Sequence, residues 1–254
     1  MRVIFLHLPK TAGQSVHAAL LRAFGQEAVC PARINDQLCV MSRAQLARYQ
    51  VFSGHFDWTL LDCLPGPKYV FTILRDPAER ILSFYFYLRN KAADMDPDAL
   101  ARPEHQGLKA ALELSPDDYF TGGQPHLRTF IDDHYDNFYT YYFAARHYMG
   151  RRLLVGLQGR GAVTEQDILT TALDNLTALD KVFSMERMPE VFRTIADLGG
   201  HAVADGPGFQ LNRNEQQMPE DRRLRLQAME SSSAAIARLG ELCRLDDRIW
   251  SMYK

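Results

Sequence analysis

Residues 2–20 read RVIFLHLPKTAGQSVHAAL, and this stretch decides the fold of the chain. An apolar run that favours a β-strand ends at Pro9, and a turn of small and polar residues with one cation, Lys10, follows it. Apolar residues then recur at helical spacing, at Val16, Ala19, Leu20 and Phe24. The pattern predicts a strand, a short loop and a helix, which is the opening unit of an α/β fold.

The loop between the strand and the helix has the composition of an anion-binding turn. A helix that begins here presents unpaired N–H groups and a positive dipole to the loop, and Lys10 adds a full charge. Thr11 and Ser15 add hydroxyl donors. Two interpretations stay open at this point: a seat for a phosphate or sulfate ester, or the ordinary turn chemistry of a strand followed by a helix.

The loop is not a Walker A loop, which reads G-x-x-x-x-G-K-[ST] and places its glycines before the lysine. The residues before Lys10 are His7, Leu8 and Pro9, and Gly13 comes after it. The backbone cradle of an enzyme that hydrolyses ATP or GTP with magnesium is therefore missing from this sequence.

Composition places the chain among globular proteins. It has 254 residues, of which 46% are hydrophobic and 24% charged, enough for one α/β domain with a sizeable core. The formal net charge of −2 argues against general nucleic-acid binding. The four cysteines form no C-x-x-C pair, so we expect mostly buried thiols in a reducing compartment and no metal site.

No targeting segment or membrane span is visible in the sequence. Met1 and Arg2 lead directly into the first predicted strand, without the apolar stretch and small-residue cleavage site of a signal peptide. No apolar run approaches the roughly 20 residues that a membrane helix needs. We therefore expect a cytoplasmic protein.

A second informative stretch, residues 49–58, reads YQVFSGHFDW. A short apolar strand ends at Gly54, and His55 follows directly. Ligands of open α/β sheets bind beyond the carboxyl ends of the strands. His55 is therefore either a base that faces a cleft or a turn residue that is hydrogen-bonded to backbone.

A third stretch, residues 68–89, reads KYVFTILRDPAERILSFYFYLR. It predicts a buried strand, then Arg75, then a helix that is capped by Asp76 and has Pro77 at its first position. Ser83 lies two turns into that helix. Arg75 either binds an anion or pairs with a nearby carboxylate, and Ser83 either meets the same anion or bonds back to its own helix.

Together these stretches resemble the sulfotransferases that use 3′-phosphoadenosine-5′-phosphosulfate (PAPS). The motifs are L-P-K-T-x-G-x-S at residues 8–15, G-H-F at 54–56 and L-R-D-P-x-E-R-x-x-S-x-Y-x-x-L at 74–88. The likeness is to the branch of the Golgi carbohydrate sulfotransferases, of the heparan and chondroitin type, and their bacterial relatives. It covers about the first 90 residues. It implies a fold like that of the P-loop NTPases, a central parallel sheet with flanking helices, and a helical insertion on the acceptor side.

The resemblance also implies roles for individual residues. Lys10 and His55 would be catalytic, with Lys10 neutralising the leaving phosphate and His55 taking the proton of the acceptor hydroxyl without a metal. The 3′-phosphate would be bound by Arg75 and Ser83. The 5′-phosphosulfate would be held by the loop residues Lys10, Thr11, Ala12, Gly13, Gln14 and Ser15. Many relatives carry Gly and Thr where this chain has Ala12 and Gln14, which leaves the contacts of Gln14 open.

Beyond residue 90 the sequence is less specific. Residues 94–150 are expected to form the helical insertion, and the His- and Tyr-rich run 126–148 is either an acceptor surface or a helical cap on the core. We expect strands at 153–157 and 181–185 and helices at 165–179 and 189–198. A loop over 201–217 contains Arg213, a candidate for closing over the cofactor, and helices are expected at 98–114, 219–243 and 246–253.

The sequence thus predicts a single domain over residues 1–254 that transfers the sulfuryl group of PAPS to a hydroxyl, most simply of a carbohydrate. A peptide tyrosine, or a small phenol or alcohol, is the alternative acceptor. A divergent nucleotide kinase and a non-catalytic nucleotide-binding protein remain as alternative classes.

Overall fold

The computed structural model describes residues 1–200 and 221–254, which divide into two compact units. The first, here called the sheet unit, comprises the described residues of 1–75, 141–200 and 251–254. The second, here called the helical unit, comprises 76–140 and 221–250. The prediction of a single domain stays a prediction.

The sheet unit contains a four-stranded sheet in which every pairing is parallel. Its strands are β1 (Arg2–Leu6), β2 (Val51–Gly54), β3 (Lys68–Leu74) and β4 (Lys181–Ser184), in the spatial order β2-β1-β3-β4. The predicted α/β class with a central parallel sheet is confirmed.

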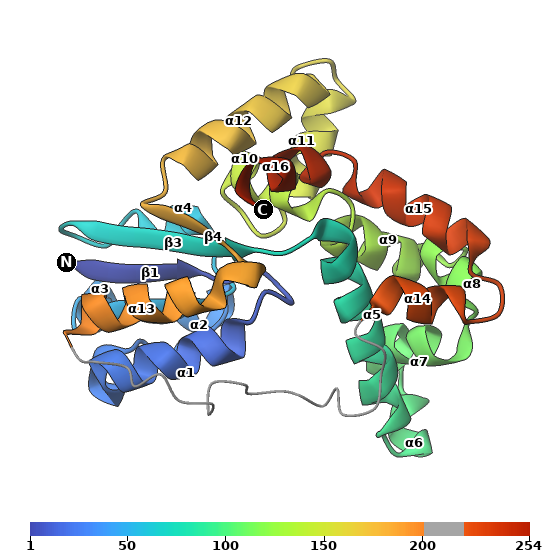
Figure 1. The fold of residues 1–254 in the computed structure, drawn as a ribbon, viewed down its shortest axis with the longest axis horizontal. Helices are drawn as coiled ribbons and strands as arrows, with labels where there is room; N and C mark the ends of the chain where they lie inside the picture. Colours follow the sequence, from blue (N-terminus) through green and yellow to red (C-terminus); the bar gives the residue numbers. More distant parts are fainter. Residues whose placement is uncertain (201–220) are drawn as a thin grey trace. The chain divides into compact units, whose positions relative to one another are not determined.

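The central strands are almost continuously apolar because helices cover both faces of a parallel sheet. One face packs on α1 (Gly13–Phe24) and α13 (Met188–Gly199), which lie together below the sheet in Figure 1. On the other side of the sheet lies α12 (Glu165–Thr177). The hydrophobic core on the face of α1 and α13 contains Phe5 of β1 and Phe71 of β3, whose rings stack with centroids 5.0 Å apart. Val16 of α1 and Val191 of α13 pack in the same core.

The strand order creates a switch point between β1 and β3. The chain leaves β1 toward β2 on one side and leaves β3 toward β4 on the other, so the two connections diverge. Ligands of open α/β sheets bind at such a point, beyond the carboxyl ends of the strands. The loop after β1 contains Lys10, and Arg75 follows β3, so both residues are positioned at this point by the topology alone.

The remaining elements of the sheet unit are short. They are η1 (Gln26–Ala28), α2 (Asn35–Cys39), α3 (Arg43–Leu46), α4 (Trp58–Leu61), α11 (Gly150–Gln158) and η3 (Met185–Arg187). The strand predicted at 153–157 is wrong, since these residues belong to α11. Leu153 and Val155 are exposed on that helix, and a short apolar run does not by itself distinguish a strand from a helix.

The helical unit has no strand among its described residues. Its helices are α5 (Pro77–Ala93), α6 (Pro97–Leu100), η2 (Pro103–His105), α7 (Gln106–Glu113), α8 (Pro116–Thr121), α9 (Pro125–His134), α14 (Arg222–Gln227) and α15 (Ser233–Cys243). Two further helices, α10 (Phe138–Ala145) and α16 (Asp246–Tyr253), begin in this unit and end in the sheet unit. The helix predicted over 98–114 is interrupted at Pro103, and the one predicted over 219–243 is interrupted between α14 and α15.

Most aromatic side chains of the run 126–148 are core residues. Tyr135 and Tyr139 are fully buried, and the hydroxyl of Tyr135 lies 3.0 Å from that of Tyr119. Burial raises the pKa of both the Tyr135 and Tyr119 phenols. The interpretation of this run as a packed helical cap therefore applies to its buried members. Tyr148, at the end of the run, is only partly buried.

Two buried charged side chains organise the middle of the helical unit. The Arg80 guanidinium has no exposed surface and donates to the carbonyls of His134 at 3.0 Å and Tyr135 at 3.4 Å. The carboxylate of Asp246, 1% exposed, accepts from the amides of Tyr139 at 3.0 Å and Thr140 at 2.9 Å. It therefore satisfies N–H groups at the start of α10 that have no partner within the helix.

Among the described residues, no helix is both long enough and apolar enough to cross a membrane.

Replacing this carboxylate tests the arrangement. Asp246→Ala leaves two buried amides without an acceptor, so we expect a loss of about 2 to 4 kcal/mol in the free energy of unfolding. Burial raises the pKa of Asp246 to about 6, so its ionisation in the folded protein costs stability. The wild type should lose stability as the pH rises from about 4 toward that value, and the variant should lack this dependence.

The measurements are thermal unfolding across this pH range and hydrogen exchange of the Tyr139 and Thr140 amides. Asp247→Ala, at the exposed neighbouring position, is the matched control and should change stability by no more than about 0.5 kcal/mol. Unchanged exchange of the two amides in Asp246→Ala would contradict the capping role.

Candidate functional site

The loop after β1 has an unusual backbone for residues that carry side chains. Lys10 and Ala12 both have positive φ angles, 67° and 60°. Left-handed backbone costs non-glycine residues about 1 kcal/mol or more each, so neighbouring contacts must hold it in place. One is the buried hydroxyl of Thr11, which donates to the carbonyl of Leu8 at 2.9 Å. The result is a tight turn that leads directly into the N-terminus of α1.

Gly13, the first residue of α1, lies against the imidazole of His7. A methyl group at position 13 would collide with this ring, so no side chain fits there without displacing His7. The His7 backbone is fixed as well, because its N–H donates to the carbonyl of Gly54 at 3.1 Å. His7 therefore connects the end of β2 to the start of α1.

His55, the first residue after β2, is held from two sides. Its Nδ1 lies 2.7 Å from the carbonyl oxygen of His7, and its ring stacks on the His7 ring with centroids 4.1 Å apart. The Tyr148 ring meets it edge-on at 5.7 Å. A carbonyl only accepts, so Nδ1 carries the proton and Nε2 of the neutral ring has the free lone pair.

The electrostatic surroundings keep these imidazoles neutral. Burial is the main cause that lowers the pKa of His55, and the charge of Arg33 lowers it further, although the bond to His7 opposes them. The pKa of His7 is lowered well below its ordinary value by burial, with His55, Arg33, His17 and Lys10 adding to the effect. At neutral pH His55 is therefore an unprotonated base beside a lysine-bearing loop.

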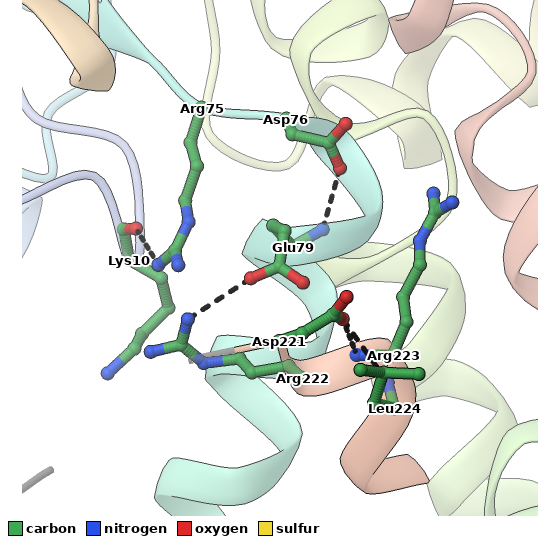
Figure 2. Close-up of polar contacts among 8 residues, drawn as sticks. All are labelled: Lys10, Arg75, Asp76, Glu79, Asp221, Arg222, Arg223 and Leu224. Carbon is green, nitrogen blue, oxygen red and sulfur yellow. Dashed lines mark hydrogen bonds and ion pairs between the residues drawn. The ribbon is translucent and has the colours of Figure 1, made fainter. Parts of the chain in front are cut away.

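Arg75 lies at the same end of the sheet, as its position after β3 predicts. Its Nη1 makes a long hydrogen bond of 3.5 Å to the carbonyl of Lys10, drawn in Figure 2. The carboxylates considered as alternative partners have contacts of their own within the helical unit. Asp76 caps α5 by accepting from the amide of Glu79 at 2.9 Å, and Glu79 pairs with Arg222 at 3.1 Å.

The other predicted site residues are less closely defined. Gln14 is exposed and Ser15 partly exposed in the first turn of α1. Ser83 is partly buried on α5 in the helical unit, and its role in binding a phosphate stays a prediction. The predicted cofactor residue Arg213 and the loop 201–217 lie outside the described residues.

Three residues of this site escaped the sequence analysis: His7, His17 and Arg33. His7 lies at the carboxyl end of the first strand, and this position was the signal that could have identified it as a site residue. Nothing marks His17 or Arg33 in the sequence, because their proximity depends on how the segment after η1 runs beside β2. Among the described residues, no group of three or more His, Cys, Asp or Glu side chains is arranged to hold a metal ion.

Fold and site together define an α/β protein with a tight, lysine-bearing loop at the switch point of a parallel sheet and a neutral histidine at the end of the neighbouring strand. Comparison with known proteins makes this class more specific. The chain is 33% identical over 93 residues to a protein-tyrosine sulfotransferase of Arabidopsis thaliana. It is 29% identical over 114 residues to the human heparan-sulfate 6-O-sulfotransferase 1, and 30% identical over the same length to heparan-sulfate 6-O-sulfotransferase 2 of Gallus gallus.

These alignments cover 35–36% of this chain and 18–28% of the relatives, so the chain spans less than a third of their length. No family model matches the chain. The resemblance to sulfotransferases that the three motifs indicate is confirmed over about a third of the chain.

The contact between Gly13 and His7 yields a direct test. Gly13→Ala must displace the His7 ring, so we expect a destabilisation of about 1 to 3 kcal/mol together with altered surroundings of His55. Thermal unfolding and the imidazole NMR signals of His55 measure the two effects. Gly156→Ala, where an added methyl group meets nothing within 4 Å, is the control and should be neutral or slightly stabilising. Unaltered His55 signals in Gly13→Ala would refute the link through His7.

Proposed function

We propose that this protein is a PAPS-dependent sulfotransferase that moves a sulfuryl group to a hydroxyl of a carbohydrate, with His55 as the general base. One observation carries the proposal. The backbone carbonyl of His7 fixes the tautomer of His55, and the His7 ring packs on the first residue of the helix that begins at the anion-binding loop. The contacts of His7 thereby hold the proposed base and the proposed anion site in fixed positions.

The donor fits the residues of the loop. The positive φ angles at Lys10 and Ala12 bend the backbone tightly into α1, whose first N–H groups and dipole favour a phosphate. Lys10 supplies a full positive charge beside them. We assign the 5′-phosphosulfate to this loop and the 3′-phosphate to Arg75, whose guanidinium suits two phosphate oxygens at once.

In the proposed reaction the acceptor oxygen forms a bond to sulfur while the bond from sulfur to the bridging phosphate oxygen breaks. The proton of the acceptor hydroxyl passes to Nε2 of His55. The electron pair of the broken bond leaves with 3′-phosphoadenosine 5′-phosphate. Lys10 and the N-terminus of α1 would stabilise the charge that develops on this phosphate, and charge stabilisation and positioning are the main sources of catalysis in such transfers.

The acceptor is the least determined part of the proposal. Relatives named for heparan sulfate support a carbohydrate, and the relative named for protein tyrosine supports a phenol as the second candidate. A sugar hydroxyl is the weaker acid of the two and has the greater need of a base in hydrogen-bond reach. The neutral state of His55 therefore favours the carbohydrate.

Calorimetric titration with 3′-phosphoadenosine 5′-phosphate, beside AMP and ATP with magnesium, tests the donor assignment. We expect tight binding of the first nucleotide alone. Arg75→Ala should weaken it by about ten- to a hundredfold, the effect of one charge-assisted contact, and should leave the binding of AMP nearly unchanged. Equal losses for both nucleotides would remove Arg75 from the 3′-phosphate, and a preference for ATP with magnesium would favour a kinase.

His55→Ala tests the base. Turnover should fall by at least about a hundredfold, since a positioned base contributes that much or more, while the affinity for the nucleotide is kept. A non-catalytic binding protein would show no turnover to lose. Arg48→Ala, at an exposed position of the sheet unit outside the predicted site, is the control and should retain full activity.

The same base predicts a pH dependence in the wild type. Activity requires neutral His55, so kcat/KM should fall with decreasing pH only as the pH passes through the pKa of this residue. Burial holds that pKa below 6.5, so kcat/KM should fall to half of its plateau value only below pH 6.5. A half-maximal value reached above pH 6.5 would contradict the assignment.

A further inference from the structure

The segment that follows α10, residues 146–149, is held against α4 in a strained conformation. Arg146 has a positive φ of 55°, which costs a residue with a side chain about 1 kcal/mol or more. Its carbonyl accepts from the amide of Thr59 at 3.3 Å, and its guanidinium donates to Asp62 at 2.7 Å. The guanidinium also lies over the Trp58 ring, 4.2 Å from the centroid. These contacts offset the strain, and the strained turn fixes the course of the residues that follow it.

Asp57, two residues beyond His55, binds the same segment with both carboxylate oxygens. It precedes α4 directly and is 7% exposed, yet its side chain does not cap that helix. Oδ1 accepts from the amide of Tyr148 at 2.6 Å, and Oδ2 lies 3.0 Å from Nε2 of His147. The amide of Met149 donates to Nδ1 of His147 at 3.0 Å, so the proton of this ring is on Nε2, which donates to Asp57. Two donors of one short segment thus converge on a nearly buried carboxylate.

The residue that these contacts place beside the proposed base is Tyr148. Its ring meets the His55 ring at an angle of 69°, with centroids 5.7 Å apart, while the His7 ring stacks on His55 at 4.1 Å. The Tyr148 ring also lies 6.4 Å from that of Tyr142, whose hydroxyl donates to the carbonyl of Phe56 at 2.9 Å. Rotation of an imidazole about its last side-chain bond has broad minima, so packing on the ring decides how narrowly its nitrogens are aimed. His7 and Tyr148 supply that packing for His55.

We infer that Asp57 is a positioning residue for the proposed base. It holds Tyr148 against His55, and the rings packed on His55 keep its Nε2 in one direction. This inference rests on the proposed function for the role of His55 as a base. Proton transfer needs a base aligned with the acceptor hydroxyl, and small misplacements of reacting groups lower rates steeply. Asp57 therefore acts through Tyr148 and takes no part in the transfer itself.

Asp57→Asn tests this role with a side chain of the same shape. An amide has one oxygen, so it accepts from Tyr148 or from His147 and sets an N–H against the other donor. We expect Tyr148 to lose its fixed position, and the ring signals of His55 in the NMR spectrum of the whole chain to shift and broaden. These signals report the surroundings of the imidazole without donor or acceptor. A purely structural Asp57 would affect thermal unfolding and leave them unchanged.

A double-mutant cycle tests whether Asp57 acts through Tyr148. Tyr148→Ala removes the ring and should change the His55 signals in the same way, and adding Asp57→Asn to it should change them no further. Tyr148→Phe keeps the ring and should keep the signals close to those of the wild type. Asp197→Asn, at an exposed position of α13, is the matched control and should leave them unchanged.

The kinetic consequence is measured with PAPS and a hexasaccharide of alternating glucuronate and N-acetylglucosamine as the acceptor probe. Asp57→Asn and Tyr148→Ala should each lower kcat by about tenfold, the effect of a base that is imprecisely placed. Calorimetry should show unchanged affinity for 3′-phosphoadenosine 5′-phosphate in both variants. Tyr148→Phe should retain most of the activity.

The outcomes separate this inference from the proposed function. Unchanged His55 signals in Asp57→Asn, effects of Asp57→Asn and Tyr148→Ala that simply add, or an unchanged kcat despite changed signals overturn the positioning role and leave the function intact. If Asp57→Asn does not fold, Asp57→Ala, which places no N–H opposite either donor, takes its place in the cycle. Failure of the wild type to bind the nucleotide or to sulfate any acceptor overturns the function, while the His55 signals still test the contact.

Discussion

The structure depends on how a single residue, His7, is held at the end of the first strand. Its N–H bonds to the end of β2, its carbonyl orients the ring of His55, and its own ring occupies the space that a side chain at position 13 would need. The end of β2, distant in sequence, thereby meets the end of β1 and the start of α1 at one residue. His55 and the loop after β1 are aligned with each other because both are held by His7.

The neutrality of the histidines follows from that arrangement. Burial alone disfavours an imidazolium, Arg33 opposes its formation further at both His7 and His55, and Lys10 does so at His7. Burial and the charge of Arg33 therefore keep His55 able to accept a proton.

The fold was predictable from sequence where the pattern is local and long. The runs at residues 2–6 and 68–74 are buried strands as predicted, because β-branched and aromatic residues are continuous there. The predicted cap Asp76 begins a helix. The strand predicted at 153–157 was wrong, because the four apolar residues of this run fit a helix as well as a strand. The residues around His55 could not be predicted from the sequence. His7 meets His55 only because of the register between β1 and β2, and Arg33 lies near His55 only because its segment forms a bridge beside β2.

The loop after β1 makes a tight turn into a helix without the glycines of a Walker A motif. A glycine-rich loop reaches left-handed backbone at no steric cost, whereas here Lys10 and Ala12 adopt it with side chains in place. The cost of each is offset by a buried neighbour, through the hydroxyl of Thr11 and the packing of Gly13 on His7. A loop held in this way is ordered by contacts within the chain. A ligand that bound there would therefore spend little free energy on ordering the loop.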